Sequence, residues 1–376
     1  MTTTKWSIQM ADSFIEHYPI VSDMPFQKKR NWNYENGIVL TALERVYKAT
    51  GDRKYYEYIK RNMDLFIKAD GTIATYNLNE YNVDMINQGK ALFLLYQHTG
   101  DEKYRKAIEL LVTQLKSHPR TSEGGLWHKK IYPFQMWLDG VYMMSPLLTA
   151  YARMFHEHEW FDDVANEILL MEKRSRDPRT GLLYHGWDES KEQRWANKDT
   201  GCSPHFWGRA VGWYVMAIVD VLDDMPLDHP KRGEIIGIFW RLTEALIDVQ
   251  DPESGMWWQV LDQGGREGNY LETSATAMFV CAFAKGARHG YLGGNALEAA
   301  RRGYEGMLKR CIEPSANGGG YHLNHICGVA GLGNKPYRDG SYEYYVGEVI
   351  RQDDPKGVAP FIMASLEIEA VEGLSE

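Results

Sequence analysis

A segment of this sequence recurs 49 residues further along the chain. Residues 46–59, VYKATGDRKYYEYI, align with residues 95–108, LYQHTGDEKYRKAI, and both copies contain Thr-Gly-Asp-x-Lys-Tyr. In this pattern the glycine ends one helix in a left-handed conformation, and the aspartate caps the next helix. Each copy is therefore predicted to be a helix, a tight turn and a second helix. A period near 50 residues is typical of an array of helical hairpins.

Apolar residues spaced near 3.6 extend this array along the whole chain. The first helices of the hairpins are predicted at residues 36–49, 84–98, 138–155, 206–223, 272–288 and 355–370. The second helices are predicted at 52–68, 101–117, 158–174, 231–249 and 294–310, and the N-terminal segment 5–18 is the sixth. The first helices are rich in small and apolar residues, whereas the second helices are amphipathic, so the two sets suit an inner and an outer ring.

Six hairpins divided in this way predict an all-α fold, an (α/α)6 barrel, with residues 1–376 forming a single catalytic domain. An open array would need polar capping repeats at its two ends. A closed ring needs none, because the N-terminal helix packs beside the last hairpin and covers both ends of the array.

Composition excludes several classes of partner. The net charge of −9 argues against binding to nucleic acid or to an anionic membrane. The four cysteines have no paired spacing, the N-terminus lacks the apolar core of a leader, and no apolar run is long enough to cross a membrane. We expect a cytoplasmic protein, a monomer or small homo-oligomer, with reduced thiols.

Two acidic residues stand at the predicted starts of inner helices. Asp139 lies in the apolar stretch QMWLDGVYM (135–143), and Asp84 lies in YNVDMINQG (81–89). A shift of 49 residues back from Asp84 reaches Glu35, so three successive hairpins begin with an acid. A buried unpaired carboxylate costs several kcal/mol and is usually paired, protonated or functional. The alternative for each is a carboxylate that stabilises a helix N-terminus.

The loops before inner helices share glycine followed by aromatic residues and often histidine. Examples are GGLWHKK (124–130), GLLYHGWD (181–188), GMWWQV (255–260) and GGYHLN (319–324), and these predict one aromatic rim around a site. Two of these loops carry His128 and His185, although either histidine could be structural.

Basic residues near this rim could attract an anion. Arg209 and Trp213 in CSPHFWGRAVGWYVM (202–216) are one helical turn apart and share a face, which suits a carboxylate bound beside a ring. The alternative is an arginine that binds helix carbonyls. Lys129 adds charge, unless it is only an exposed loop lysine. No nucleotide-binding, zinc-protease or serine-hydrolase motif is present.

The chain resembles the unsaturated rhamnogalacturonyl hydrolases, glycoside hydrolase family 105, which are related to the unsaturated glucuronyl hydrolases of family 88. The resemblance rests on MWLDGVYMMSP (136–146), HFWGRAVGW (205–213), GLLYHGWD and CGVAGLGNKPYRDGSYEYYVGE (327–348), in order along nearly the whole chain. It implies an (α/α)6 barrel. It also implies that Asp139 is the catalytic acid/base and that the substrate-binding residues are Asp84, His128, Lys129, His185, Arg209 and Trp213. No metal or organic cofactor is implied.

The resemblance further implies the reaction. The expected partner is a short pectin-derived oligosaccharide that ends in a 4,5-unsaturated uronic acid, with unsaturated galacturonyl-rhamnose as the expected substrate, and the enzyme is expected to protonate C4 and hydrate C5. Three alternatives remain: a sugar epimerase or isomerase on the same barrel, an ordinary two-carboxylate glycosidase, and a helical-repeat binding scaffold. A family 88 glucuronyl hydrolase with another substrate would share the chemistry.

Overall fold

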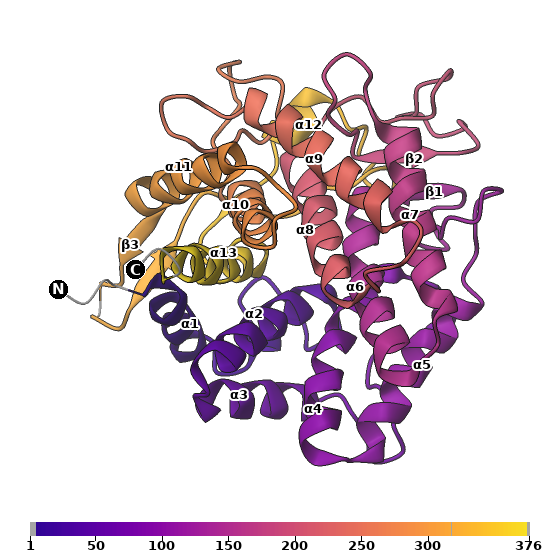
Figure 1. Ribbon diagram of the computed structural model, residues 1–376, viewed down its shortest axis with the longest axis vertical. Helices are drawn as coiled ribbons and strands as arrows, with labels where there is room; N and C mark the ends of the chain where they lie inside the picture. The colour runs from indigo at the N-terminus through magenta and orange to yellow at the C-terminus, as the bar shows by residue number, and fades with distance from the viewer. Residues whose placement is uncertain (1–4, 317, 374–376) are drawn as a thin grey trace.

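The computed structural model describes residues 5–316 and 318–373 and shows two concentric rings of helices (Figure 1). The inner ring consists of α2 (Tyr34–Thr50), η3 (Val83–Lys90) continued by α4 (Ala91–Thr99), α6 (Leu138–Phe155), α8 (Gly208–Asp224), α10 (Thr273–Arg288) and α13 (Pro355–Gly373). The outer ring consists of α1 (Trp6–His17), α3 (Arg53–Asp64), α5 (Glu102–Lys116), α7 (Glu159–Ser175), α9 (Arg232–Asp248) and α11 (Gly294–Arg310). Residues 1–4, which belong to the segment predicted to lack a leader, lie outside the described part.

The inner ring is closed. Each inner segment packs on the next around the ring, and α13 packs on α2. The N-terminal helix α1 packs against α13 and takes the position of the sixth outer helix. The predicted (α/α)6 barrel is therefore confirmed, including the place of the N-terminal segment.

The repeated motif forms the predicted turn in both copies. Gly51 and Gly100 end their helices with φ of 71° and 65°, in the left-handed region that favours glycine. Asp52 and Asp101 each accept a hydrogen bond at 3.0 Å from the backbone N–H two residues later and so cap the following helix.

The lysine and tyrosine of the motif join neighbouring outer helices. Tyr104 on α5 donates to Asp64 of α3 at 2.7 Å, and Tyr55 on α3 donates to Asp12 of α1 at 2.8 Å. The lysine before each tyrosine pairs with the same aspartate. Because α1 receives the same contacts from α3 that α3 receives from α5, α1 occupies the preceding position in the outer ring.

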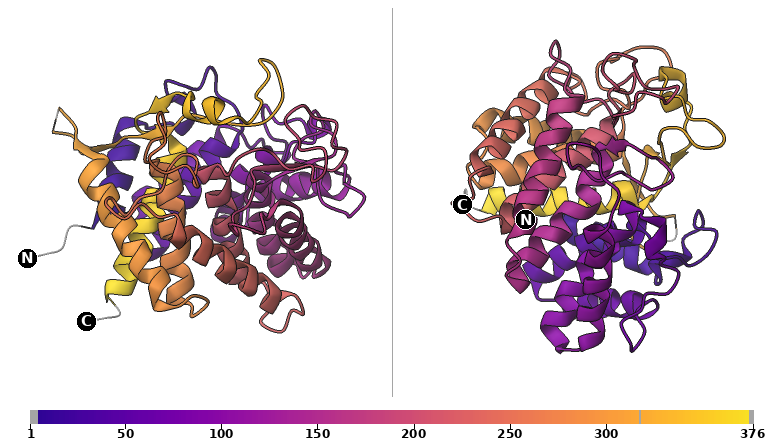
Figure 2. Two further views of the ribbon diagram at one scale, coloured as in Figure 1. Left: turned by 90° about the horizontal axis from the view of Figure 1, so that it is seen from above. Right: turned by 90° about the vertical axis from the view of Figure 1, so that its right-hand side faces the viewer.

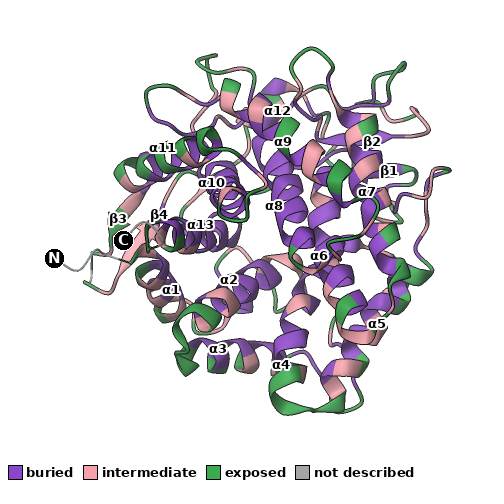
Figure 3. Ribbon diagram, viewed as in Figure 1, coloured by how far each residue is buried: buried purple, intermediate pink, exposed green. Residues whose placement is uncertain are grey.

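Burial separates the rings as their composition predicts (Figure 3). Residues 273–286 of α10 are all buried, because its small and apolar side chains contact other helices on every side. Helix α5 buries one stripe that includes Tyr104, Ile108, Leu111 and Leu115 and leaves its charged face to solvent.

Two features differ from the expected all-helical hairpins. Residues 83–90 form a 3-10 helix, η3, where a continuous α-helix over 84–98 was predicted. Over two turns, apolar spacing cannot distinguish three residues per turn from 3.6. The loops also contain strand pairs between β1 (Gln135–Trp137) and β2 (Gly186–Asp188), β3 (Ile312–Pro314) and β4 (Tyr321–Leu323), and β5 (Ile326–Cys327) and β6 (Ile350–Arg351).

The last loop contains the short helix α12 (Tyr342–Val346) and lies across one end of the barrel (Figure 2). The short interhelical turns at Gly51 and Gly100 join the other ends of the helices. Within the described residues, no helix is both long enough and apolar enough to span a membrane.

Candidate active site

Strands β1 and β2 place an acid beside a histidine. Trp137 is paired with Gly186, and the N–H of Leu138 donates to the carbonyl of His185 at 3.0 Å. Helix α6 begins directly after β1, so Asp139 lies in its first turn. The strand pair therefore sets the side chains of Asp139 and His185 next to each other.

A cavity of about 110 Å³ lies at the end of the barrel where the inner helices begin. Its lining comes from the starts of inner helices and from the rim loops: Tyr34, Asp84, His128, Lys129, Trp137, Asp139, Met143, Trp207, Arg209, Trp213, Val329, Ala330, Arg338 and Lys356. All the predicted site residues except His185 line this cavity. His185 is fully buried and lies behind Asp139.

Asp139 has few polar neighbours among the described residues. Its Oδ2 lies 3.1 Å from Nε2 of His185, but the angles there are not those of a hydrogen bond. In the part of the chain that the structure describes, no lysine or arginine nitrogen lies within 4.0 Å of this carboxylate. The side chain is 13% exposed, and since Oδ2 is buried, Oδ1 is the oxygen that can face the cavity.

Asp84 is instead paired with a cation. Its Oδ2 lies 2.6 Å from Nζ of Lys129, and its Oδ1 lies 3.4 Å from Nε2 of His128. Burial raises the pKa of Asp84, but the charge of Lys129 and the contact with His128 outweigh burial and hold this pKa below its ordinary value. Asp84 is therefore an anion at neutral pH, and the two acids of the cavity differ in their partners.

His128 is a neutral, stacked residue. Its ring stacks on Trp137 with centroids 4.3 Å apart, and Trp137 stacks in turn on Tyr132 at 4.9 Å. Burial lowers the pKa of His128 to about 4. A Cβ added at Gly140 would lie 2.9 Å from Nδ1 of His128, so glycine at this position of α6 allows the ring to approach the helix.

Arg209 is fully buried, and three of its five N–H groups bind the protein. Its Nε donates to Oγ of Ser274 at 2.8 Å, Nη1 donates to the carbonyl of Gly328 at 3.2 Å, and Nη2 donates to the carbonyl of Cys327. Nη2 also lies 3.6 Å from Glu272. Arg209 thus lines the cavity and joins α8 to α10 and β5, and its predicted contact with a substrate carboxylate stays a prediction.

Trp213 has an equally rigid setting. It is buried, lines the cavity and stacks on Tyr142 with ring centroids 4.9 Å apart. Tyr34 meets it edge-on at 6.5 Å. The ring offers a fixed apolar wall against which a sugar could pack.

Sequence reasoning missed several residues that line the cavity or lie behind its wall. Lys356 opens α13 and could have been found by the rule that inner helices begin at the rim. Arg338 lies in the glycine- and tyrosine-rich loop that the sequence singles out, but nothing in that loop distinguished it. Tyr345, in the same loop, binds His185 and had no signal of its own.

Two predicted rim features do not line the cavity. Glu35, the third acid, pairs with Lys356 at 2.5 Å and does not line the cavity. His322, from GGYHLN, contacts Asp353 at 2.6 Å and stacks on His17 at 4.7 Å with an interplanar angle of 16°. His17, His322 and Asp353 each bring a possible ligand atom to within 4.8 Å of the others. The two rings are nearly parallel, so their nitrogen lone pairs lie in separate planes and do not converge on one point as metal ligands would.

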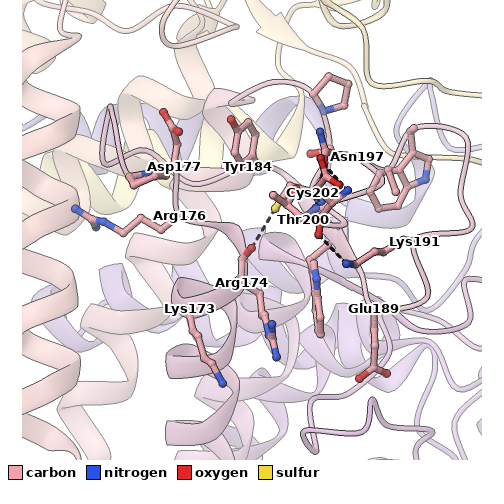
Figure 4. Close-up of a pocket in the computed structure, with 17 residues that line it drawn as sticks. Lys173, Arg174, Arg176, Asp177, Tyr184, Glu189, Lys191, Asn197, Thr200 and Cys202 are labelled. Carbon is pink, nitrogen blue, oxygen red and sulfur yellow. Dashed lines mark hydrogen bonds between the residues drawn. The ribbon is translucent and has the colours of Figure 1, made fainter.

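A larger cavity of about 710 Å³ lies beside β2 (Figure 4). Trp187 lines it and points to the opposite face of the strand pair from Trp137. Arg174 is on its wall, and its carbonyl accepts a hydrogen bond from Sγ of Cys202 at 3.0 Å. No histidine is among the described residues that line this space, whereas the smaller cavity combines acids, histidine and aromatic rings.

Basic side chains outnumber acidic ones among the residues that line the smaller cavity. Lys129, Arg209, Arg338 and Lys356 line it together with the two acids Asp84 and Asp139, and His128 is neutral because burial lowers its pKa to about 4. Three of these cations have acidic partners, because Lys129 pairs with Asp84, Lys356 pairs with Glu35 and Asp354, and Arg209 lies 3.6 Å from Glu272. Among the described residues, Arg338 is the lining cation with no carboxylate within 4.0 Å. The site therefore suits an anionic ligand that also presents a sugar ring to aromatic walls.

The sequence profile of Glycosyl Hydrolase Family 88 matches residues 6–371. This chain belongs to that family. A solved structure of a family 105 glycoside hydrolase from C. acetobutylicum is 46% identical, with a TM-score of 0.93 over 98% of this chain and 100% of that chain. The resemblance to families 105 and 88 is confirmed, and the protein is a glycoside hydrolase.

Two further relatives are similar to this chain. The 24.9 kDa protein in the picA locus of Rhizobium radiobacter is 44% identical over 193 residues, which cover 50% of this chain and 82% of that relative. The unsaturated rhamnogalacturonyl hydrolase YesR of Bacillus subtilis is 29% identical over 258 residues, covering 67% of this chain and 70% of YesR.

Proposed function

We propose that this hydrolase removes a 4,5-unsaturated uronic acid from the non-reducing end of short oligosaccharides left by polysaccharide lyases. The relationship to YesR supports unsaturated galacturonyl-rhamnose as the substrate. An unsaturated 3S-rhamnoglycuronyl hydrolase of Formosa agariphila, 25% identical over 173 residues, supports the same class of unsaturated uronide. Arg338, which lines the cavity and has no carboxylate within 4.0 Å among the described residues, supports a ligand that carries a carboxylate.

The observation that carries this proposal is the difference between the two acids. Lys129 at 2.6 Å holds Asp84 as an anion, whereas among the described residues His185 is the one ionisable partner within 4.0 Å of Asp139. An ordinary glycosidase uses two carboxyl groups, one of which gives a proton to the leaving group. Asp139 is the carboxyl group free to exchange a proton with the sugar, and hydration of a double bond needs only one such group.

The first step transfers a proton from Asp139 to C4 of the unsaturated ring. The C4–C5 double bond supplies the electron pair, and the positive charge that develops at C5 is shared with the ring oxygen. Asp139 becomes a carboxylate. Asp84, bound to Lys129, holds the sugar in this proposal by accepting hydrogen bonds from the sugar's hydroxyl groups.

The second step adds water at C5. The carboxylate of Asp139 takes a proton from this water as its oxygen bonds to C5, so the acid form is restored. The resulting hemiketal opens by breaking the bond between C5 and the ring oxygen, which leaves a ketone at C5. The hemiacetal left at C1 then expels the remaining sugar as an alcohol. The net reaction consumes one water.

The Asp139→Asn variant tests the role of Asp139. We expect it to fold normally and to lose at least about a hundredfold in turnover, the lower end for a general acid/base. The matched control is Asp162→Asn, because Asp162 is an exposed first-turn acid on the outer helix α7. Near-normal turnover by Asp139→Asn on every lyase-generated disaccharide would refute the proposal.

Labelling tests where the bonds form. In deuterated water we expect deuterium at C4 of the product and loss of the ultraviolet absorbance of the conjugated double bond. The saturated analogue of the same disaccharide should remain intact. A two-carboxylate glycosidase would cleave that analogue and leave C4 unlabelled, an epimerase would interconvert saturated sugars, and a binding scaffold would release no product.

A further inference from the structure

His185 lies between Asp139 and a tyrosine from the last loop. Its Nε2 is 3.1 Å from Oδ2 of Asp139, and its Nδ1 is 2.7 Å from the hydroxyl of Tyr345. Both His185 and Tyr345 have no exposed surface, and neither lines the cavity. A side chain in this position cannot contact a sugar directly, so its effect on the reaction must pass through Asp139.

We propose that Tyr345 is a positioning residue for the hydrolase. Its hydroxyl fixes the tautomer of His185 so that an N–H on Nε2 faces Asp139. That N–H holds Oδ2 in the wall of the site, and the other carboxylate oxygen is left to face the sugar. This inference rests on the proposed role of Asp139 as acid/base.

The hydrogen-bonding partners of Tyr345 decide the direction of the first bond. Burial raises the pKa of Tyr345 well above its ordinary value, so the hydroxyl keeps its proton. Among the described residues, the hydrogen-bonding partner of this hydroxyl is Nδ1 of His185. The hydroxyl therefore donates and Nδ1 accepts. When His185 carries one N–H, that proton is on Nε2, because Nδ1 is the acceptor.

Tyr345 is itself held on two sides. Gln259 donates from Nε2 to the carbonyl of Tyr345 at 2.9 Å, and its Oε1 accepts from the indole N–H of Trp207 at 3.1 Å. Trp207 stacks on Tyr345 with centroids 5.9 Å apart and lies 4.8 Å from the ring of His185. Gln259 comes from GMWWQV, so this predicted rim segment contributes to the site by supporting Tyr345.

The chemical benefit arises when Asp139 is charged. After the proton moves to C4, the new carboxylate is stabilised by the Nε2–H of His185, and it is held in place to accept a proton from water. In the free enzyme the angles between Nε2 of His185 and Oδ2 of Asp139 are not those of a hydrogen bond. Such bonds often tighten only when substrate is bound.

Nitrogen NMR of the histidine side chains tests the tautomer without substrate. We expect wild-type His185, assigned by comparison with His185→Gln, to show its proton on Nε2. Tyr345→Phe removes the hydroxyl and should give a mixture of tautomers. A wild-type signal with the proton on Nδ1 would overturn the proposal, even if the variant failed to fold.

Kinetics test the consequence. Tyr345→Phe keeps the buried ring, so we expect kcat to fall about threefold to tenfold, the effect of one lost hydrogen bond, with KM nearly unchanged and a shifted pH profile of kcat. The matched control is Tyr304→Phe on the distant helix α11. It removes a buried hydroxyl that donates to Oγ of Ser365 at 2.9 Å, and it should change neither kcat nor its pH profile.

The outcomes separate this inference from the proposed function. If Tyr345→Phe has the kcat and pH profile of the wild type, Tyr345 does not position the acid. If the wild type hydrates no unsaturated uronide, the proposed function fails, and the NMR spectrum still decides whether Tyr345 sets the tautomer of His185.

Discussion

At Asp84 and at His128, which meet beside α6, burial and the neighbouring charge shift the pKa in opposite directions. Lys129 keeps Asp84 charged, whereas His128 is kept neutral because burial lowers its pKa to about 4. His128 therefore has an energetic cost at low pH, where the unfolded chain can bind a proton that the folded protein does not. The polar residues of this cavity therefore also affect the stability of the fold.

The free energy of unfolding should depend on pH through His128. Its folded pKa, about 4, lies below the ordinary 6.5. The contribution of His128 to the free energy of unfolding is fully present above pH 6.5. It is lost as the pH falls from 6.5 to 4, by up to about 3 kcal/mol. We expect His128→Phe, which can keep the stacking on Trp137, to show a smaller loss over this range in urea unfolding. The control is His98→Phe at an exposed position. An equal loss in wild type and His128→Phe would contradict this expectation.

At the scale of elements, the start of α8 depends on the loops that follow α10. Arg209 binds Ser274 at the start of α10 and the carbonyl of Gly328 after β5, and it lies 3.6 Å from the buried Glu272. These contacts join three chain segments at the floor of the cavity. Part of the local positive charge is therefore also a structural link between helices.

Arg209→Met should destabilise the fold. The substitution removes the cation beside the buried Glu272 and the donors to the carbonyls of Cys327 and Gly328, and breaking a buried pair costs about 3–5 kcal/mol. The control is Arg241→Met, because Arg241 forms an exposed pair with Glu172 at 2.9 Å and such pairs contribute under about 1 kcal/mol. Chemical denaturation measures both. If Arg209→Met unfolds like this control and loses only uronate binding, Arg209 is a substrate ligand, as the sequence predicts.

At the scale of the whole molecule, closure makes the N-terminal helix part of the core. Phe14 on α1 is 2% exposed although it lies close to the chain end. Terminal segments are ordinarily the part of a domain that tolerates change best. In this barrel α1 covers α13 and completes the outer ring, so the usual tolerance should not apply.

Phe14→Ala should therefore lower the free energy of unfolding by about 3–5 kcal/mol, as much as such a substitution in any central helix. Trp240→Ala on α9 is the control, because Trp240 is 52% exposed and its loss should change stability by less than about 0.5 kcal/mol. Urea unfolding gives both values. A loss for Phe14→Ala as small as that of the control would show that α1 frays from the ring.

Much of the site was predictable because position in the repeat carries information. Asp84 and Asp139 occupy equivalent starts of inner helices, and both line the cavity as their places in the hairpins suggest. Lys356 obeys the same rule but follows a long irregular loop, which obscured its place. The different partners of the two acids were not predictable, because Lys129 contacts Asp84 only after the loop before α6 has folded back.

Local chemistry in the sequence determined the helices, their turns and their division into two rings, because capping and apolar spacing act over a few residues. The repeat of Thr-Gly-Asp with lysine and tyrosine even specified how outer helices are joined. Only the tertiary structure decided which side chains meet in the site. His185 and Tyr345 are 160 residues apart, and their contact exists because strand pairing, a buried glutamine and the closed ring bring two loops together. Such contacts depend on the packing of the whole barrel, which no short stretch of sequence contains.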